Sequence, residues 1–383
     1  MAGLYLHIPF CEHKCIYCDF YSIAPDKGPE NQEELQRRFL SALHRELGLR
    51  ASNPEFHKER FTTIFFGGGT PSLLDPSNIS AVLEDLAARF PFSDDVEITL
   101  ETNPGTVDRE KLKAFRKAGI NRVSIGIQSF HEDDLRFLTR IHSAEQAKDC
   151  VRSAFEAGFE NVSVDLMFAL PHQTLERWES NLQQAVELNP THCSCYSLIV
   201  EPNTPLARMV HSKQVNPLSP EVDNELYQFT IRFLGDHGYD QYEVSNFAKP
   251  GFKSRHNSLY WDHSNYLGFG PSAHSFWTGT RWWNISNVVG YAEALEKGRL
   301  PSIGEERLSP NQLRDEEVFL RLRSEGIDVK GFQRRFHRNF VEEFEQEVGH
   351  LLESRLATFD GTRFRLTPAG YALCDEICLS FLR

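Results

Sequence analysis

Three cysteines near the start of the chain have the type and spacing to hold an inorganic centre. Cys11, Cys15 and Cys18 follow the apolar run of residues 4–10 at a C-x3-C-x2-C spacing. A loop this short can gather three thiolates, and soft sulfur ligands select zinc or iron–sulfur clusters. A structural zinc site requires four protein ligands, and the residues that follow Cys18 supply no suitable fourth ligand. Three thiolates suit a 4Fe–4S cluster with one open iron, and a reduced, buried trio of thiols remains the alternative.

The bulk composition limits the classes of function. The 383 residues are enough for one large and one small domain, and 40% are hydrophobic. The net charge of -13 argues against generic nucleic-acid binding, which usually needs a basic surface. No apolar run approaches the roughly 18 residues of a membrane span, although peripheral membrane contact stays open. Because the chain starts directly in a strand pattern without a signal sequence, we expect a cytoplasmic protein.

The elements that must position these cysteines alternate between strand and helix patterns. After a polar connection at 26–34, the apolar stripes of the helices repeat between short apolar runs. Strands are predicted at 4–10, 61–66, 96–101, 122–129, 161–170 and 191–200, and helices at 32–49, 77–90, 108–118, 144–157, 175–188 and 217–238. This repetition implies a parallel sheet with right-handed crossovers. Six such units predict an α/β fold with a partial (β/α)6 TIM-like barrel.

Polar residues stand where the predicted strands end. Gly67, Gly68 and Gly69 let the backbone approach a ligand closely, although an ordinary tight turn would also use them. Glu101 ends the strand at 96–101, which suits the ligand face of a barrel or, alternatively, a surface ion pair. The next two strands carry Gln128 and Asp165.

The chain changes character between the barrel units and the C-terminus. Residues 250–283 are rich in Gly, Ser, Asn and aromatic residues, so we expect this stretch to be largely irregular, and we expect residues 241–310 to cap the barrel. Aromatic rings beside imidazoles could hold a flat ligand and its iron, or His256 could simply pack with ordinary hydrogen bonds. This divides the chain into a barrel (1–240), a His- and aromatic-rich segment (241–310) and a C-terminal domain (311–383).

The last part of the chain reads as a small winged-helix-like α/β domain. Helices are predicted at 317–322 and 339–356, followed by a hairpin strand at 361–366 and a final helix to residue 381. Winged helices often bind DNA, but the second helix is acidic, which argues against phosphate contacts. We therefore expect a packing or partner-docking domain. The acidic residues are Glu342, Glu343, Glu345 and Glu347.

Taken together, these motifs resemble the radical S-adenosylmethionine (SAM) family. The cysteine spacing after the first strand, the segment Gly67-Gly68-Gly69-Thr70-Pro71 and the run Leu6-His7-Ile8-Pro9-Phe10-Cys11 all match it. The resemblance covers almost the whole chain. Within the family it points to the group of oxygen-independent coproporphyrinogen III dehydrogenases and their relatives, the HemW heme chaperones. It implies a 4Fe–4S cluster whose open iron is chelated by the amine and carboxylate of SAM.

The resemblance also implies which residues hold SAM. Tyr5 would pack beside the cluster, and the glycines and Thr70 would hold the amino-acid part of SAM. Glu101 would accept a hydrogen bond from the SAM amine. Arg140 and Asp165 would supply charge and hydrogen bonds, and no residue is assigned as catalytic. The full set is Tyr5, Tyr17, Gly68, Gly69, Thr70, Glu101, Gln128, Arg140 and Asp165, with Cys11, Cys15 and Cys18 as the cluster ligands.

Two departures from the pattern of the dehydrogenases match the HemW chaperones instead. The dehydrogenases carry a fourth cysteine where this chain has Phe20, and they carry a long N-terminal extension. Residues 256–261 resemble the HNxxYW heme-associated motif of the HemW chaperones, which implies heme contacts at His256, Tyr260 and Trp261. With three methionines in the chain, a His/Met-ligated heme is disfavoured.

The resemblance therefore predicts a heme carrier that passes heme to an acceptor protein. The alternative is an enzyme that decarboxylates the propionates of coproporphyrinogen by radical chemistry, with Arg140 or Arg255 binding the propionates. A methyl transferase or ring-opening enzyme acting on heme is a third possibility.

Overall fold

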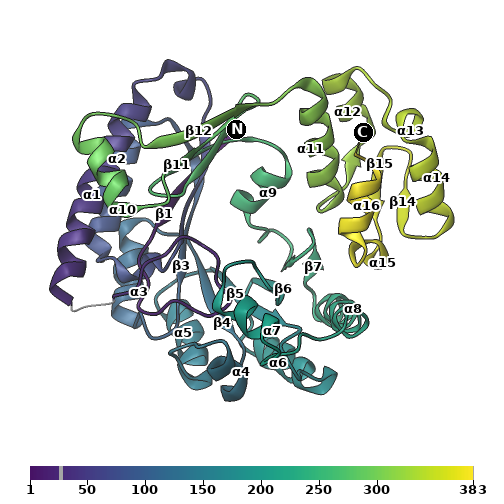
Figure 1. Cartoon of the computed structure of the whole chain (residues 1–383), viewed down its shortest axis with the longest axis horizontal. Coiled ribbons are helices and arrows are strands. Elements are labelled where there is room, and N and C mark those ends of the chain that lie inside the picture. Colours follow the sequence, from purple (N-terminus) through teal and green to yellow (C-terminus); the bar gives the residue numbers. More distant parts are fainter. Residues whose placement is uncertain (26–28, 383) are drawn as a thin grey trace.

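One curved sheet organises the computed structural model, which describes residues 1–25 and 29–382 (Figure 1). Its centre consists of six strands that pair in parallel in sequence order. They are β1 (Ala2–Ile8), β2 (Phe61–Gly68), β3 (Phe92–Thr102), β4 (Arg122–Gln128), β5 (Asn161–Phe168) and β6 (His192–Ser197). The predicted α/β fold with a parallel, barrel-like sheet is thereby confirmed.

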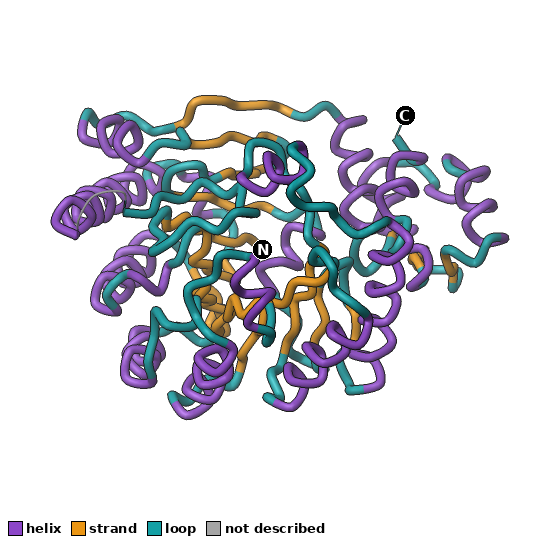
Figure 2. The backbone as a smooth tube through the Cα atoms, turned by 60° about the horizontal axis from the view of Figure 1, so that its bottom comes forward, coloured by secondary structure: helices purple, strands orange, loops and turns teal. Residues whose placement is uncertain are grey.

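Helices cover the outer side of these strands (Figure 2). The predicted ones are α1 (Pro29–Ala51), α2 (Pro76–Arg89), α3 (Arg109–Ala118), α5 (Ala144–Glu156), α6 (Leu175–Glu187) and α8 (Pro220–Asp236). Local capping residues define where these helices begin and end. In α3, the Asp108 side chain accepts a hydrogen bond from the backbone N–H of Lys111, and Gly119 ends the helix at a φ of 114°. Of the expected connection at 26–34, residues 26–28 lie outside the described residues and the rest belongs to α1. Two short helices, α4 (Glu132–Phe137) and α7 (Pro205–His211), were not predicted.

The two faces of the sheet differ in polarity because side chains alternate along a strand. On β4, Val123 and Ile125 are wholly buried in the core between sheet and helices. The alternate residues Ser124, Gly126 and Gln128 instead line a cavity on the inner side. The apolar core therefore lies outside the barrel strands, and the inner face carries polar groups.

The expectation of an irregular stretch at 250–283 was wrong, because one helix and three strands form there, and regular elements run through the whole segment 241–310. It extends the sheet at both ends: β8 (Asn246–Ala248) and β7 (Asp240–Gln241) follow β6, while β9 (Asn265–Phe269) pairs in parallel with β1. Beyond β9 come β10 (His274–Trp277), β11 (Thr280–Asn284) and β12 (Ser302–Arg307), with α10 (Val288–Glu296) between the last two. The sequence did not predict these strands because they are short and interrupted by turn residues. Gly279, for example, adopts a φ of 81° in the turn between β10 and β11.

One helix of this segment lies on the inner side of the sheet. The short helix α9 (Arg255–Trp261) contacts β1, β2 and the first helix of the C-terminal domain. Figure 1 shows it between the sheet and that domain. The heme-associated motif is therefore placed inside the fold.

The C-terminal domain has its own apolar core. Its elements are α11 (Pro310–Leu322), β13 (Ile327–Asp328), α12 (Val329–Phe336), α13 (Phe340–Glu343), α14 (Glu345–Glu353), β14 (Ala357–Phe359), β15 (Arg363–Leu366), α15 (Pro368–Tyr371) and α16 (Cys374–Ser380). The strands form a small antiparallel sheet, as a winged-helix-like domain requires.

Two expectations for this domain need correction. The single helix expected at 339–356 is two helices, because Phe344 leaves the helical conformation to bury its ring, so the acidic residues belong to two elements. The helix expected at 317–322 begins earlier, at Pro310. The apolar core of the C-terminal domain is separate from the main core, which runs through the barrel and residues 247–295, so the divisions at 240 and 310 stay predictions. Within the described residues, no helix is long and apolar enough to cross a membrane.

Candidate cofactor site

A cavity of about 420 Å³ lies at the carboxyl ends of the parallel strands, where a barrel places its ligands. Its walls come from the cysteine loop after β1, the glycine turn after β2 and the ends of β3 to β6. Most of the predicted site residues meet there. Those that line the cavity are Cys11, Cys15, Cys18, Tyr17, Gly68, Gly69, Thr70, Glu101, Gln128, Arg140 and Asp165.

The cysteine loop is tied down at its ends and bordered by donors. The backbone N–H of Cys11 donates to the carbonyl of Ile23 at 2.9 Å. The Thr70 hydroxyl lies 3.7 Å from the Cys11 sulfur, and Nη1 of Arg140 lies 3.6 Å from the Cys15 sulfur. Burial raises the pKa of Cys18 to about 11. A bound metal centre would therefore supply the positive charge that stabilises these sulfurs as thiolates.

The sulfur arrangement fits a cluster better than a single ion. A tetrahedral zinc site with bonds of about 2.3 Å holds its sulfurs within about 4 Å of each other. Among residues 1–25 and 29–382, no group of three or more Cys, His, Asp or Glu side chains is gathered for one metal ion. Iron–sulfur clusters bind each thiolate to a separate iron, so three half-buried sulfurs around one cavity suit that donor geometry.

The glycine turn is shaped by close backbone approach. The N–H of Gly69 donates to the carbonyl of Ile8 at 2.8 Å, and that of Thr70 donates to the carbonyl of Phe10 at 2.7 Å. A Cβ on Gly69 would lie 2.6 Å from the Phe10 carbonyl oxygen. Gly68 adopts a φ of 107°, which favours glycine. The turn is therefore a backbone wall that packs against the cysteine loop.

Two carboxyl groups stand beside this wall. Glu101 accepts from the backbone N–H of Gly68 at 3.2 Å, and Asp165 accepts from the Ser124 hydroxyl at 3.1 Å. Burial, together with the charge of Asp165, raises the pKa of Glu101 to about 8. Burial also raises the pKa of Asp165. In the described part of the chain Glu101 makes no surface ion pair, so its carboxyl group is free to meet a ligand.

Arg140 joins the cysteine loop to the strand ends. Its Nη2 donates to Oδ1 of Asn103 at 2.5 Å and to the carbonyl of Gly126 at 2.7 Å. Asn103 in turn donates to the Thr70 hydroxyl at 2.8 Å. Sequence reasoning missed Asn103, although it stands two residues after Glu101. Other lining residues that it missed include Ser124 and Met167, which share the inward face of their strands with Gln128 and Asp165, and Tyr196 on β6, a strand without a predicted site residue.

Tyr5 does not line the cavity. Its hydroxyl lies 3.1 Å from Nδ1 of His7, and its ring stacks on Phe65 and His256 at centroid distances of 6.2 and 6.4 Å. Tyr5 therefore lies between the cavity and helix α9. Its proposed place beside the cluster stays a prediction.

The heme-associated residues also lie away from the cavity. The His256 residue is 1% exposed, its Nδ1 lies 2.7 Å from the Thr63 hydroxyl, and its Nε2 lies 2.9 Å from the hydroxyl of Tyr260. Burial lowers the pKa of His256 to about 3, so the imidazole is neutral. Neither His256 nor Tyr260 nor Trp261 lines the cavity. Their contact with heme stays a prediction, and in this conformation His256 makes ordinary packing contacts.

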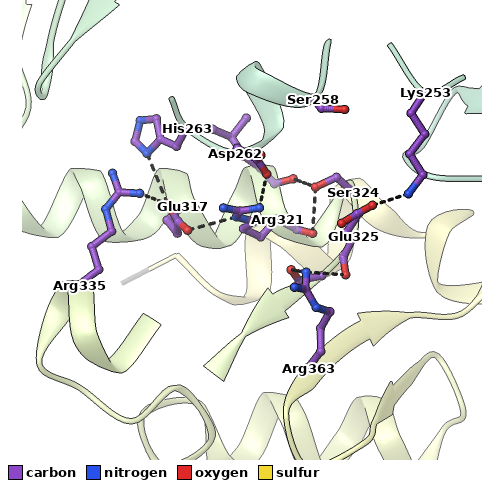
Figure 3. A network of polar contacts seen from close by, with 12 residues as sticks. Lys253, Ser258, Asp262, His263, Glu317, Arg321, Ser324, Glu325, Arg335 and Arg363 are labelled. Carbon is purple, nitrogen blue, oxygen red and sulfur yellow. Dashed lines mark hydrogen bonds and ion pairs between the residues drawn. The ribbon is translucent and has the colours of Figure 1, made fainter. Parts of the chain in front are cut away.

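The C-terminal domain holds α9 from its other side (Figure 3). Arg321 on α11 pairs with Asp262, and Nε2 of His263 lies 3.2 Å from a carboxylate oxygen of Glu316. Lys253, which precedes α9, pairs with Glu325 at 2.5 Å. These contacts fix the helix between the barrel and the C-terminal domain.

Comparison with known proteins places both parts of the chain. The family model described as "Radical SAM superfamily" matches residues 5–185. The model described as "HemN C-terminal domain" matches residues 308–373. The solved structure of coproporphyrinogen III oxidase (HemN) from Escherichia coli, a radical SAM enzyme, matches with a TM-score of 0.83 and 25% sequence identity. It matches 100% of this chain and 90% of that one.

Curated relatives are closer in sequence. The heme chaperone HemW of Bacillus subtilis is 35% identical over 100% of this chain and 99% of its own length. The heme chaperone HemW of Escherichia coli is 40% identical over 71% of this chain and 69% of its own. The chain therefore belongs to the HemW family within the radical SAM superfamily.

Proposed function

We propose that this protein is a heme chaperone that binds a 4Fe–4S cluster, SAM and heme and delivers the heme to an acceptor protein in the cytoplasm. The observation that carries the proposal is the full-length similarity to the Bacillus subtilis heme chaperone, from the first strand through the C-terminal domain. The cavity supports the cofactor part, because the three cysteines and the polar strand ends face the same space.

Each part of the cavity has a distinct role in the proposal. Cys11, Cys15 and Cys18 would hold three irons, and the open iron would take the amine and carboxylate of SAM. Glu101 would accept a hydrogen bond from the amine, since its carboxyl group stands beside the glycine wall at Gly68. This arrangement would supply a bound sulfonium next to an electron source.

The heme part of the proposal requires a movement. Both ring nitrogens of His256 are engaged inside the fold, and 1% of the residue is exposed. A heme iron therefore reaches this imidazole only when α9 leaves its packed position. A chaperone must also release its cargo, and a helix that returns to the barrel would exchange the iron for the hydroxyl of Thr63 on β2, while Tyr260 moves with His256 on α9.

Anaerobic heme titration of the cluster-reconstituted protein, followed by optical spectroscopy, tests this proposal. We expect stoichiometric binding with a shifted Soret band in the wild type and weakened binding in His256→Ala. The matched control is His192→Ala, because His192 is also wholly buried. It has a serine hydroxyl 2.7 Å from Nδ1 and a tyrosine hydroxyl 2.8 Å from Nε2.

The outcomes separate ligation from packing. Loss of binding in His256→Ala but not in His192→Ala supports a heme contact on α9. Equal loss in both variants means that a cavity in the barrel destabilises the protein, and no loss in either places the heme elsewhere. Absence of specific heme binding in the wild type contradicts the chaperone function itself.

The fold match to HemN favours a second candidate, coproporphyrinogen III decarboxylation. Arg140 lines the cavity and could meet a propionate, whereas the guanidinium of Arg255 is held by Asp95 at 3.1 Å, outside the cavity. Phe20 at the fourth-cysteine position counts against this function. Product analysis with coproporphyrinogen III, reductant and SAM distinguishes the two, because a chaperone yields no decarboxylated product.

A further inference from the structure

A buried arginine without a counterion lies beneath the cavity. Arg122 begins β4 and is 2% exposed. Its Nε has no hydrogen-bond partner, and among the described residues none forms an ion pair with its guanidinium. An uncompensated charge in a protein interior is strongly unfavourable, so such a residue needs an explanation. Nothing in the assignments above uses it.

The strand register places this arginine below the two carboxyl groups. Arg122 lies opposite Thr99 on β3, and Glu101 lies opposite Ser124, two residues farther along β4. Asp165 on β5 lies opposite Gly126, four residues farther along. Two residues of strand span about 6.6 Å, which is within the reach of an arginine side chain.

All of these side chains share the inward face of the sheet. Arg122, Ser124 and Gly126 alternate on β4, and the last two line the cavity. Ser124, two residues after Arg122 on β4, donates a hydrogen bond from its hydroxyl to the Asp165 carboxylate. Arg122 is therefore the next inward-facing neighbour of a residue that binds this carboxylate directly. The positive charge of Arg122 lowers the pKa of both Glu101 and Asp165, against the larger opposing effect of burial.

The other groups around the two carboxyls do not replace this charge. Around Glu101 stand the N–H of Gly68 and, from β1 and α9, the neutral phenols of Tyr5 and Tyr260. Asp165 meets Ser194 from β6 and the charge of Arg140 from above. Arg140 is itself engaged with Asn103 and the cysteine loop.

We propose that Arg122 is a positioning residue for the SAM site, whose buried positive charge favours the carboxylate forms of Glu101 and Asp165 against the opposing effect of burial and so helps the cavity select the sulfonium-bearing cofactor over its neutral thioether. The proposal rests on the SAM site of the proposed function. With Arg140 engaged by Asn103 and the cysteine loop, the two carboxylates and the Arg122 guanidinium leave one negative charge at the cavity wall. A sulfonium neutralises that charge, whereas the thioether of S-adenosylhomocysteine does not.

The test is the ratio of SAM affinity to S-adenosylhomocysteine affinity as a function of pH, measured by anaerobic calorimetry on the cluster-loaded protein. Both ligands carry the same amine and carboxylate, so their own titrations cancel in the ratio. In the wild type we expect the ratio to rise as pH increases through the ionisation of Glu101. In Arg122→Gln we expect this rise to move to higher pH by about one unit, because a nearby opposite charge shifts a carboxyl group by that order.

Three further variants make the result specific. Arg122→Lys keeps the charge and should keep the wild-type profile. Arg122→Met keeps the aliphatic stem without charge and should repeat the shift, which also serves if the Gln variant does not fold. Arg50→Gln removes another buried arginine, on α1, where Nη2 of Arg50 donates to Ser302 at 2.8 Å, and should leave the profile unchanged.

An affinity that falls equally at every pH in Arg122→Gln would assign Arg122 a structural role and overturn the proposal. So would an equal shift in Arg122→Lys. A wild type that binds neither ligand overturns the SAM site and this proposal together. A wild type with a normal pH profile that Arg122→Gln leaves unchanged overturns this proposal alone.

Discussion

Nδ1 of His256 lies 2.7 Å from the hydroxyl of Thr63, which joins helix α9 to the third residue of β2. On the same side, the backbone N–H of His256 donates to Glu97 at 3.0 Å. The other end of α9 is held by the C-terminal domain through Asp262 and His263. Access to the motif therefore depends on contacts made by two domains.

Weakening the contact to the C-terminal domain should free α9. In Arg321→Met, Asp262 loses its partner, while Glu317 keeps Arg335 at 2.5 Å. A partly buried ion pair of this kind is worth about 1 kcal/mol, so we expect roughly fivefold faster hydrogen exchange in residues 255–261. Hydrogen exchange with mass spectrometry measures this.

The control for that experiment is Arg334→Met, which removes an exposed ion pair with Asp328 within the C-terminal domain. Exchange in α9 should not change in this variant. If Arg321→Met also leaves the exchange of α9 unchanged, the ion pair between Arg321 and Asp262 does not restrain this helix.

The Glu101 carboxyl makes stability depend on pH. Its pKa is raised to about 8 in the folded protein, so the folded state binds more protons than the unfolded state between about pH 4.5 and 8. Stability of the cofactor-free protein should therefore fall as pH rises through this window. In Glu101→Gln the decrease should be smaller, and the variant should exceed the wild type at pH 8.5 by roughly 1–3 kcal/mol. Urea unfolding at pH 5, 7 and 8.5 measures the difference, and parallel curves for both proteins would contradict the assigned pKa.

Gly69 should tolerate no side chain. A Cβ there would lie 2.6 Å from the carbonyl oxygen of Phe10, and backbone cannot yield as a flexible side chain can. We expect Gly69→Ala to destabilise the protein by about 1–3 kcal/mol and to reduce its iron content after reconstitution. Gly235→Ala on α8 is the matched control, because its Cβ would meet no atom within 4 Å. That change should stabilise by about 0.5–1 kcal/mol, and equal effects of both changes would refute the steric argument.

The cysteines differ in what they bind. Cys15→Ser should abolish cluster assembly, because two thiolates and a serine hold iron poorly. Cys150→Ala removes a thiol buried on α5 away from the cavity and should leave the iron content unchanged. Iron and sulfide analysis with the visible absorption of reconstituted protein reads this out. Full iron content in Cys15→Ser would remove Cys15 from the ligand set.

The sequence by itself determined the order of the six strand–helix units and the edge at which their polar ends meet. These features are local: periodicity decides helix or strand, and parallel strands bring Glu101, Gln128 and Asp165 to one end. The cysteine loop and glycine turn follow from the same rule, because each follows a strand in the same direction.

Only the tertiary structure decided what lies inside the barrel. No local pattern indicates that α9 turns inward, that Arg122 lies beneath Glu101, or that β9 pairs with β1, more than 250 residues earlier in the chain. The break at Phe344 has the same origin, because the ring is buried in the core of the C-terminal domain at the cost of helical continuity. These features depend on contacts between distant segments, and their energies outweigh the local preferences that a sequence displays.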